Sequence, residues 1–140
     1  MAFLFDTNAI SEVFRRRPNP DFVKWLQQVP REDQFTSTIV VGELLAGARS
    51  SAQPDVWLQR YEGDIIGRLS ILPFDLECAH QYGIVRAQLR RMGAPIGEPD
   101  TLIAATALRH SLTVVTANAR HFQRIQGLEV REFRPGATRG

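Results

Sequence analysis

Cysteine, lysine and long apolar runs are all scarce in this 140-residue sequence. The single cysteine, Cys78, cannot form an internal disulfide, so we expect a reducing compartment, with the cytoplasm as the default. The strongly apolar stretches, such as residues 38–48, fall short of the roughly 20 residues that a membrane-spanning helix needs. The first residues carry no basic segment and meet an acid at Asp6, which argues against a secretory signal. We therefore expect a cytoplasmic protein that does not contact membranes.

Lysine is almost absent from the basic residues: of 17 in total, only Lys24 is a lysine and the rest are arginines. The planar guanidinium suits bidentate contacts with phosphate, so this bias is compatible with a nucleic-acid ligand. Arginine is also abundant in proteins from high-GC genomes, and the formal net charge is only +2, so charge does not decide the function. The length and the hydrophobic content of 44% predict one globular domain over residues 1–134, followed by a flexible tail over residues 135–140.

Strand and helix signals alternate along the chain, which predicts an α/β fold built on a mainly parallel sheet. Short apolar or alternating runs bounded by polar residues predict the strands, and amphipathic spacing with Ser, Asp or Pro at the start predicts the helices. We expect strands at residues 3–5, 34–37, 70–74, 112–116 and 128–133, and helices at residues 7–17, 20–29, 38–50, 54–69, 76–92, 100–110 and 118–125.

Three acids stand beside apolar residues. Asp6 directly follows the expected strand Phe3–Phe5, and Asn118 follows the strand 112–116, so both are expected where the carboxyl ends of parallel strands meet. On helical spacing of 100° per residue, Glu43 and Asp100 each head an apolar face. These faces comprise Ile39, Val40, Ala46 and Gly47 for Glu43, and Ile103, Ala104 and Ala107 for Asp100.

The three acids are costly if they lie close together. Two carboxylates about 5 Å apart repel by roughly 3 kcal/mol at an effective dielectric constant of 20, so a cluster of three needs protons or cations. Oxygen ligands without histidine or cysteine suit Mg²⁺ or Mn²⁺, and the water on such an ion can hydrolyse a phosphodiester. Ordinary roles are open for each acid alone: Asp6 or Asp100 as a helix N-cap, and Glu43 as a surface residue.

Four blocks of the sequence resemble the PIN-domain ribonucleases, specifically the VapC/FitB-type toxins of toxin–antitoxin pairs. The blocks are FLFDTNAISE (3–12), VVGELLAGA (40–48), DTLIAATAL (100–108) and LTVVTANARHF (112–122), in the family's order. The resemblance implies a three-layer α/β/α sandwich with a mainly parallel sheet. It also implies a metal-dependent endoribonuclease in which Asp6, Glu43 and Asp100 bind Mg²⁺ or Mn²⁺.

The fourth acidic position of the family falls in the last block, and here the sequence departs from the pattern. Asn118 and His121 stand where other members carry Asp. An amide can orient a water or ligate weakly, so we assign Asn118 to the catalytic set and expect one firmly bound ion. Glu98 either supplies the missing negative charge or is a solvated loop acid.

Further residues are assigned by the same resemblance. Thr7 and Asn8 resemble the pair that supports the first metal-binding Asp, although both could simply start a helix, and Thr116 is expected to border the site. Candidate contacts for RNA phosphates are Arg15, Arg16, Arg17, Arg90, Arg91 and Arg120, all of which could instead be solvated helix ends.

The expected partners are an RNA substrate, a cognate antitoxin and a second copy of the chain. The family uses helices such as those carrying Trp25, Trp57 and Tyr61 for homodimerisation and for an antitoxin-binding groove, although these side chains could equally belong to the core. Two alternatives to a ribonuclease toxin are a PIN domain that binds RNA or a partner without cleavage, and a Mg²⁺-dependent DNA nuclease or phosphatase that uses the same acids.

Overall fold

A five-stranded parallel sheet forms the centre of the molecule, in a computed structural model that describes residues 1–136. The strand order is β3-β2-β1-β4-β5, and every neighbouring pair is parallel. The strands are β1 (Phe3–Phe5), β2 (Gln34–Ser37), β3 (Ser70–Leu72), β4 (Thr113–Thr116) and β5 (Val130–Glu132). The predicted parallel α/β sheet is therefore confirmed, with the last strand at one edge.

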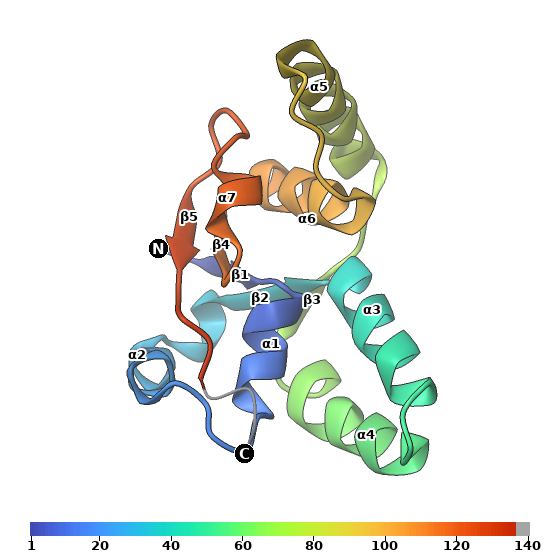
Figure 1. Ribbon diagram of the computed structural model, residues 1–140, viewed down its shortest axis with the longest axis vertical. Helices are drawn as coiled ribbons and strands as arrows, with labels where there is room; N and C mark the ends of the chain where they lie inside the picture. Colours follow the sequence, from blue (N-terminus) through green and yellow to red (C-terminus); the bar gives the residue numbers. More distant parts are fainter. Residues whose placement is uncertain (137–140) are drawn as a thin grey trace.

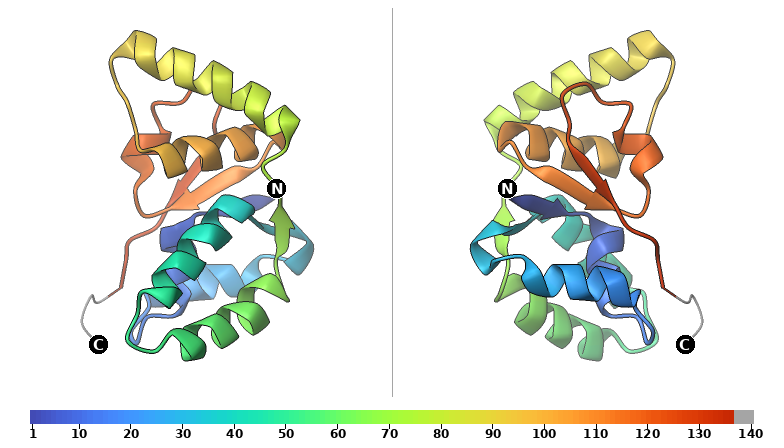
Figure 2. Two further views of the ribbon diagram at one scale, coloured as in Figure 1. Left: turned by 90° about the vertical axis from the view of Figure 1, so that its right-hand side faces the viewer. Right: turned by 90° about the vertical axis from the view of Figure 1, so that its left-hand side faces the viewer.

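Helices cover both faces of the sheet (Figure 1). α6 lies against one face and α5 packs on its outer side, while α1, α2 and α4 lie on the opposite face (Figure 2). The helices are α1 (Thr7–Val13), α2 (Pro20–Gln28), α3 (Thr38–Arg49), α4 (Pro54–Tyr61), α5 (Leu76–Met92), α6 (Glu98–Arg109) and α7 (Ala119–Phe122), with a 3₁₀ turn η1 (Arg31–Asp33) and a π turn η2 (Glu62–Ile66). The three-layer sandwich is confirmed.

The two central strands are buried along their whole length. Both β1 and β4 consist only of buried residues, because each is paired on both sides and covered on both faces. Leu4, Val114 and Val115 have no exposed surface, and α6 contributes Ile103, Ala104 and Ala107 to the same core. This core fixes the strand ends, and with them the residues that follow each strand.

Local signals set most helix boundaries. Asp6, Asn19, Ser37 and Asp75 each accept a backbone N–H at the start of α1, α2, α3 and α5, as N-caps do. Gly93 ends α5 in the left-handed region, with a φ of 63°, where glycine is favoured.

Several expected boundaries were wrong. The strands expected at 70–74 and 128–133 cover Ser70–Leu72 and Val130–Glu132, the helix expected at 118–125 covers Ala119–Phe122, and three further helices differ as follows. The first helix ends at Val13 and not at residue 17, because the buried Glu12 side chain accepts from Asn19 N (2.7 Å) and holds the following loop against α1. The expected helix over 54–69 changes to the π turn η2 after Tyr61. The helix expected from residue 100 begins at Glu98, with Pro99 in its first turn.

The expected tail has only two described residues, Pro135 and Gly136, and residues 137–140 lie outside the described part of the chain. Gly136 N donates to Glu12 Oε2 (2.7 Å), so the segment after β5 is attached to the end of α1. Across residues 1–136, no helix combines the length and the hydropathy that crossing a membrane requires.

Candidate active site

The carboxylate of Asp6 lies at the carboxyl edge of the two central strands. Asp6 N donates to Val115 O (3.1 Å), so β1 and β4 remain paired up to the point where α1 begins. The Asp6 side chain accepts from Ala9 N (2.8 Å) and caps α1, yet the residue is only 3% exposed. The cap and the buried acid, which the sequence offered as alternatives, are thus properties of the same residue.

Burial determines the protonation of Asp6. Loss of solvent raises the pKa of Asp6 from 3.8 to about 6, against the opposing effects of hydrogen bonds from the Thr116 hydroxyl and the Ala9 amide. The negative charge of Asp100 raises it further. Asp6 and Asp100 therefore interact electrostatically, although 93 residues lie between them in the sequence.

Thr116 connects Asp6 to the next loop. Thr116 is fully buried at the end of β4; its hydroxyl donates to Asp6 and accepts from Asn118 N (2.9 Å). Thr116 thus contacts Asp6, and its role at the border of the site stays a prediction. The Asn118 side chain does not cap α7 and is free to turn toward His121.

Asp100 lies in the first turn of α6 and is not its N-cap, since Gly97 occupies that position. The N-cap alternative for Asp100 is therefore wrong. Asp100 Oδ2 is 3.1 Å from His121 Nδ1, which is in turn 3.0 Å from Asn118 Nδ2. One continuous set of contacts thus crosses the ends of β1 and β4 and the start of α6. It runs through Asp6, Thr116, Asn118, His121 and Asp100.

Glu43 joins this set through Thr7. The Thr7 hydroxyl donates to Glu43 Oε1, and Thr7 directly follows Asp6, so α3 brings its acid beside the start of α1. The apolar face expected around Glu43 is only partly buried: Val40, Leu44 and Ala48 form the buried stripe of α3, whereas Ala46 and Gly47 are exposed. Glu43 itself is half-buried at the border of that stripe.

Glu98 takes part in a different group. Its carboxylate accepts from the Tyr82 hydroxyl (2.6 Å) and pairs with Arg86 (2.8 Å), both on α5. The hydrogen bonds from Tyr82 and Arg86 hold the pKa of Glu98 below its usual value. The negative charge of Glu98 is therefore balanced by Arg86 at the α5–α6 junction. Asn8, which the sequence also assigned beside the site, has an exposed side chain.

The candidate phosphate-binding arginines occupy different surroundings. Arg15 pairs with the buried Glu12 (3.1 Å), which gives it a structural role at the end of α1. Arg120 is exposed on α7 next to His121, and Arg90 and Arg91 are exposed in the last turn of α5. Arg16 and Arg17 are exposed in the loop that follows α1.

Sequence reasoning missed Glu12 as a structural acid. It is 1% exposed and accepts from the backbone amides of Asn19 and Gly136 while it pairs with Arg15. The local signals are its spacing of three from the buried Ala9, which places both on one face of α1, and its spacing of three from Arg15. Its other partners, the amides of Asn19 and Gly136, come from two loops that no local pattern reveals.

The donor set fits a hard divalent cation. Asp6, Glu43 and Asp100 offer carboxylate oxygens, and within residues 1–136 neither Asp6 nor Glu43 forms an ion pair with a basic side chain. Burial raises the pKa of Asp6, and the negative charge of Asp100 raises it further. Among the residues described, no three His, Cys, Asp or Glu side chains already stand close enough to hold a metal ion. Ligation would therefore require side-chain rotation within this group.

The PIN domain model matches residues 3–128. The chain belongs to the PIN domain family. Among curated relatives, the tRNA(fMet)-specific endonuclease VapC of Salmonella typhimurium is 34% identical over 133 residues, covering 95% of this chain and 98% of the relative. Toxin FitB of Neisseria gonorrhoeae is 39% identical over 124 residues, covering 85% of this chain and 89% of the relative.

Solved structures of related complexes share the fold of this PIN domain. The crystal structure of VapBC2 from Rickettsia felis, bound to a promoter DNA fragment, has a chain with a TM-score of 0.86 and 27% identity, covering 95% of this chain and 99% of that one. The FitAcB structure from Neisseria gonorrhoeae has a chain with a TM-score of 0.83 and 36% identity, covering 91% and 95%. The resemblance inferred from the four sequence blocks is confirmed.

Proposed function

We propose that this PIN domain is a metal-dependent endoribonuclease and the toxin of a toxin–antitoxin pair. The observation that carries the proposal is the buried Asp6 carboxylate, which lacks a cationic partner in the described chain and lies within electrostatic reach of Asp100. The relatives named as VapC ribonucleases and as a FitB toxin support the same activity and role.

Asp6, Asp100 and Glu43 would hold Mg²⁺ or Mn²⁺, which when bound supplies an activated water for phosphodiester hydrolysis. Thr7 orients Glu43 through its hydroxyl, and Thr116 holds the Asp6 carboxylate by donating to it. Asn118 is held by Thr116 and His121 at the rim of the site. Exposed arginines near the rim, of which Arg120 is the nearest in sequence to His121, would bind RNA phosphates.

The test of catalysis compares two N-capping aspartates. Asp6 caps α1 through Ala9 N, and Asp75 caps α5 through Cys78 N (3.0 Å), so Asp6→Asn and Asp75→Asn make the same local change at different places. We expect the purified chain to cleave RNA with Mg²⁺ or Mn²⁺ and not with EDTA. Asp6→Asn should abolish cleavage, whereas Asp75→Asn should retain it.

Two other results would replace this proposal. Retention of RNA without cleavage under every ion condition would favour the non-catalytic binding domain, an alternative that the uncharged Asn118 at the fourth position supports. Metal-dependent hydrolysis of DNA or small phosphate esters, without RNA cleavage, would favour the DNA nuclease or phosphatase.

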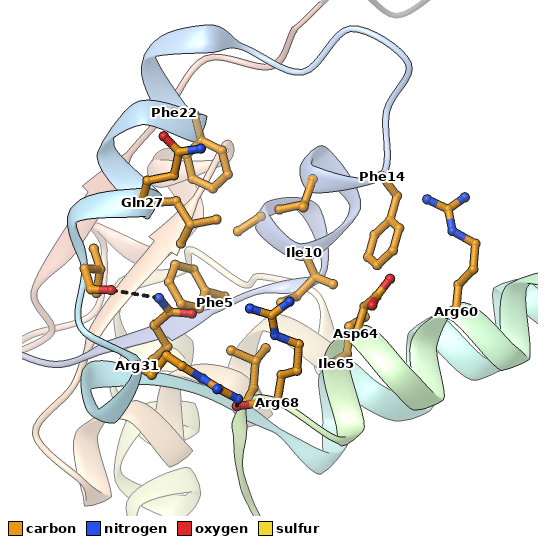
Figure 3. A pocket seen from close by; sticks show the side chains of 16 residues that line it. Phe5, Ile10, Phe14, Phe22, Gln27, Arg31, Arg60, Asp64, Ile65 and Arg68 are labelled. Carbon is orange, nitrogen blue, oxygen red and sulfur yellow. Dashed lines mark hydrogen bonds between the residues drawn. The ribbon is translucent and has the colours of Figure 1, made fainter.

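A cavity on the face of the sheet opposite α6 supports the antitoxin partner. It has a volume of about 520 Å³ and lies between α1, α2 and η2 (Figure 3). Its walls are mostly apolar, with arginines and one acid among them. Its lining includes Phe5, Ile10, Val13, Phe14, Phe22, Leu26 and Ile65, together with Arg31, Arg60, Arg68 and Asp64. These residues suit an amphipathic antitoxin segment whose apolar side chains enter the cavity and whose acidic side chains meet the arginines.

Substitution of two exposed valines provides the test of this cavity. Val13 lines the cavity and is 46% exposed, while Val56 on α4 is 48% exposed and does not line it. Each variant is co-expressed with a candidate antitoxin that co-purifies with the native chain. We expect Val13→Glu to abolish co-purification and Val56→Glu to preserve it, with RNA cleavage intact in both. Equal capture of the antitoxin by both variants would exclude the cavity as the antitoxin-binding surface.

We further propose that the outer face of α5 forms a homodimer interface. Leu76 and Ile84 are 71% and 61% exposed on the side of this helix away from the buried Cys78, Val85 and Leu89, and the helix lies on the outside of the molecule (Figure 1). Sedimentation velocity should give a dimer for the native chain and a monomer for Ile84→Glu. A native chain that sediments as a monomer at all concentrations would refute this.

A further inference from the structure

The segment that follows β5 (residues 133–136, the post-β5 segment) is bound to the end of α1 by a pair of charges. Gly136 N donates to Glu12 Oε2 (2.7 Å), and Gly136 O accepts from Arg15 Nη1 (3.3 Å). Glu12 and Arg15 also pair with each other (3.1 Å), and Glu12 is buried. One ion pair therefore binds both polar backbone atoms of Gly136, which fixes the segment where it passes the end of α1 (Figure 1).

Gly136 lies so close to the loop between α1 and α2 that no side chain fits at this position. A Cβ atom there would collide with Arg17 O and lie 2.7 Å from Asn19 N, and both are backbone atoms. Asn19 is bound to the same segment by its side chain, which donates to Arg134 O (2.9 Å) and also accepts from Asp21 N (2.8 Å) as the N-cap of α2. The post-β5 segment is therefore attached to the residue at which α2 begins.

Ring contacts extend this attachment along α2. The Phe133 ring stacks on Phe22 with the centroids 4.4 Å apart, and the Arg131 guanidinium lies 4.2 Å from the centre of the Trp25 ring. Phe22 is the one residue of α2 that is buried. The position of α2 therefore depends on a contact that the post-β5 segment supplies.

Phe22 also lines the proposed antitoxin cavity, as do Leu26 and Gln27 of the same helix (Figure 3). A movement of Phe133 therefore reaches the wall of the cavity through a single side chain, Phe22. A binding site whose wall is in place for only part of the time has a lower apparent affinity, in proportion to that fraction.

We propose that the post-β5 segment holds α2 in the position that binds the antitoxin, and so sets the antitoxin affinity from outside the cavity. The inference rests on the antitoxin role proposed for the cavity and adds the part of the chain that controls it. None of residues 133–136 lines the cavity, and the acids of the proposed metal site lie before α1, on α3 and on α6. Release of the segment therefore weakens antitoxin binding and leaves RNA cleavage in place.

The test uses two variants of the full chain that release the segment in different ways. Gly136→Ala forces the segment away from the loop, and Phe133→Ala removes the ring that stacks on Phe22. Gly47→Ala is the control, because a Cβ atom at residue 47 meets no atom within 4 Å. Hydrogen exchange followed by mass spectrometry should show the amides of α2 exchanging about tenfold faster or more in both variants and at the native rate in the control. The amides of β1 and β4 should keep their native protection in all three.

Antitoxin affinity and RNA cleavage are then measured on the same proteins. With an antitoxin that co-purifies with the native chain, we expect the dissociation constant to rise about tenfold in Gly136→Ala and in Phe133→Ala and to stay native in Gly47→Ala. The rate of RNA cleavage by the free chain should stay within about twofold of the native rate.

The contrary results separate the inference from the proposals on which it depends. Native exchange in α2, or native antitoxin affinity in both variants while Val13→Glu loses binding, would overturn the inference and leave the antitoxin cavity intact. Faster exchange in β1 and β4 as well, or a loss of RNA cleavage equal to the loss of affinity, would overturn it too, since the segment would then support the whole fold. Antitoxin binding that survives Val13→Glu would overturn the cavity and the inference together, whereas a native chain that cleaves no RNA would overturn only the nuclease.

Discussion

Replacing Asp6 with asparagine should stabilise the metal-free protein at neutral pH. Asp6 is 3% exposed, and its pKa rises from 3.8 to about 6, chiefly through burial. The folded state therefore binds the proton more tightly than the unfolded state. The free energy of unfolding is highest, as far as Asp6 is concerned, below about pH 4 and falls as pH rises through 6. The difference between 3.8 and about 6 corresponds to about 3 kcal/mol lost near pH 7.5.

Asparagine keeps the cap and removes the charge. Because Asn is as good an N-cap as Asp, Asp6→Asn should raise the free energy of unfolding near pH 7.5 by about 1–3 kcal/mol in EDTA. The gain should vanish near pH 4. Asp75→Asn is the control, since hydrogen bonding by Cys78 lowers the pKa of Asp75 and its replacement should give no such gain. Urea unfolding followed by circular dichroism, at one protein concentration and several pH values, measures all three chains.

Metal should reverse the order of stability. Added Mn²⁺ should stabilise the native chain through binding to the folded state and leave Asp6→Asn nearly unaffected. An Asp6→Asn variant that is less stable than the native chain in EDTA at pH 7.5, or a difference that does not depend on pH, would refute the reasoning about the buried charge.

Three further substitutions test individual contacts. Glu12→Ala should cost about 3–5 kcal/mol of unfolding free energy, because it leaves Arg15 and two backbone amides without their buried acceptor; a urea midpoint unchanged from the native value would contradict this. Thr7→Val should weaken Mn²⁺ binding by about tenfold, since Glu43 loses its hydroxyl donor, and calorimetry would show no change if that bond is unimportant. Glu98→Gln should leave Mn²⁺ affinity within about twofold, because Tyr82 and Arg86 already hold its carboxylate; a large loss would place Glu98 in the site.

Much of the fold follows from local sequence. The continuous apolar residues of β1 and the β-branched residues of β4 indicate strands, and the N-caps at Ser37 and Asp75 mark the starts of their helices. The positions of Asp6 and Asn118 after parallel strands also place them at one edge without any coordinates. Hydrophobic periodicity, helix N-caps and the ends of strands depend only on short segments of the chain. A single sequence therefore predicts them.

Other features depend on contacts between distant segments. The early end of α1 is set by the bond from Asn19 to Glu12, and Glu12 is also bound by Gly136, 124 positions later. The π turn after Tyr61 allows Ile65 to enter the core, where it is 2% exposed, and no residue in the stretch signals that change of pitch. The partners of Glu98 lie on α5, so its role could not be decided from its distance to Asp100 in the chain.

Asp6 and Asp75 show why local pattern alone cannot separate a cap from a functional acid. Both follow a short strand or its extension, both begin a helix, and both accept the backbone amide three residues ahead. The pKa of Asp75 is lowered by that bond, whereas the pKa of Asp6 is raised because burial outweighs the same bond. The difference arises from the strands on both sides of β1 and from Asp100 on α6, which close over one aspartate and leave the other in water. A buried carboxylate without a counter-charge is costly, and the cap alone needs no such burial, which is why we expect Asp6 to serve the proposed metal site and not only the start of α1.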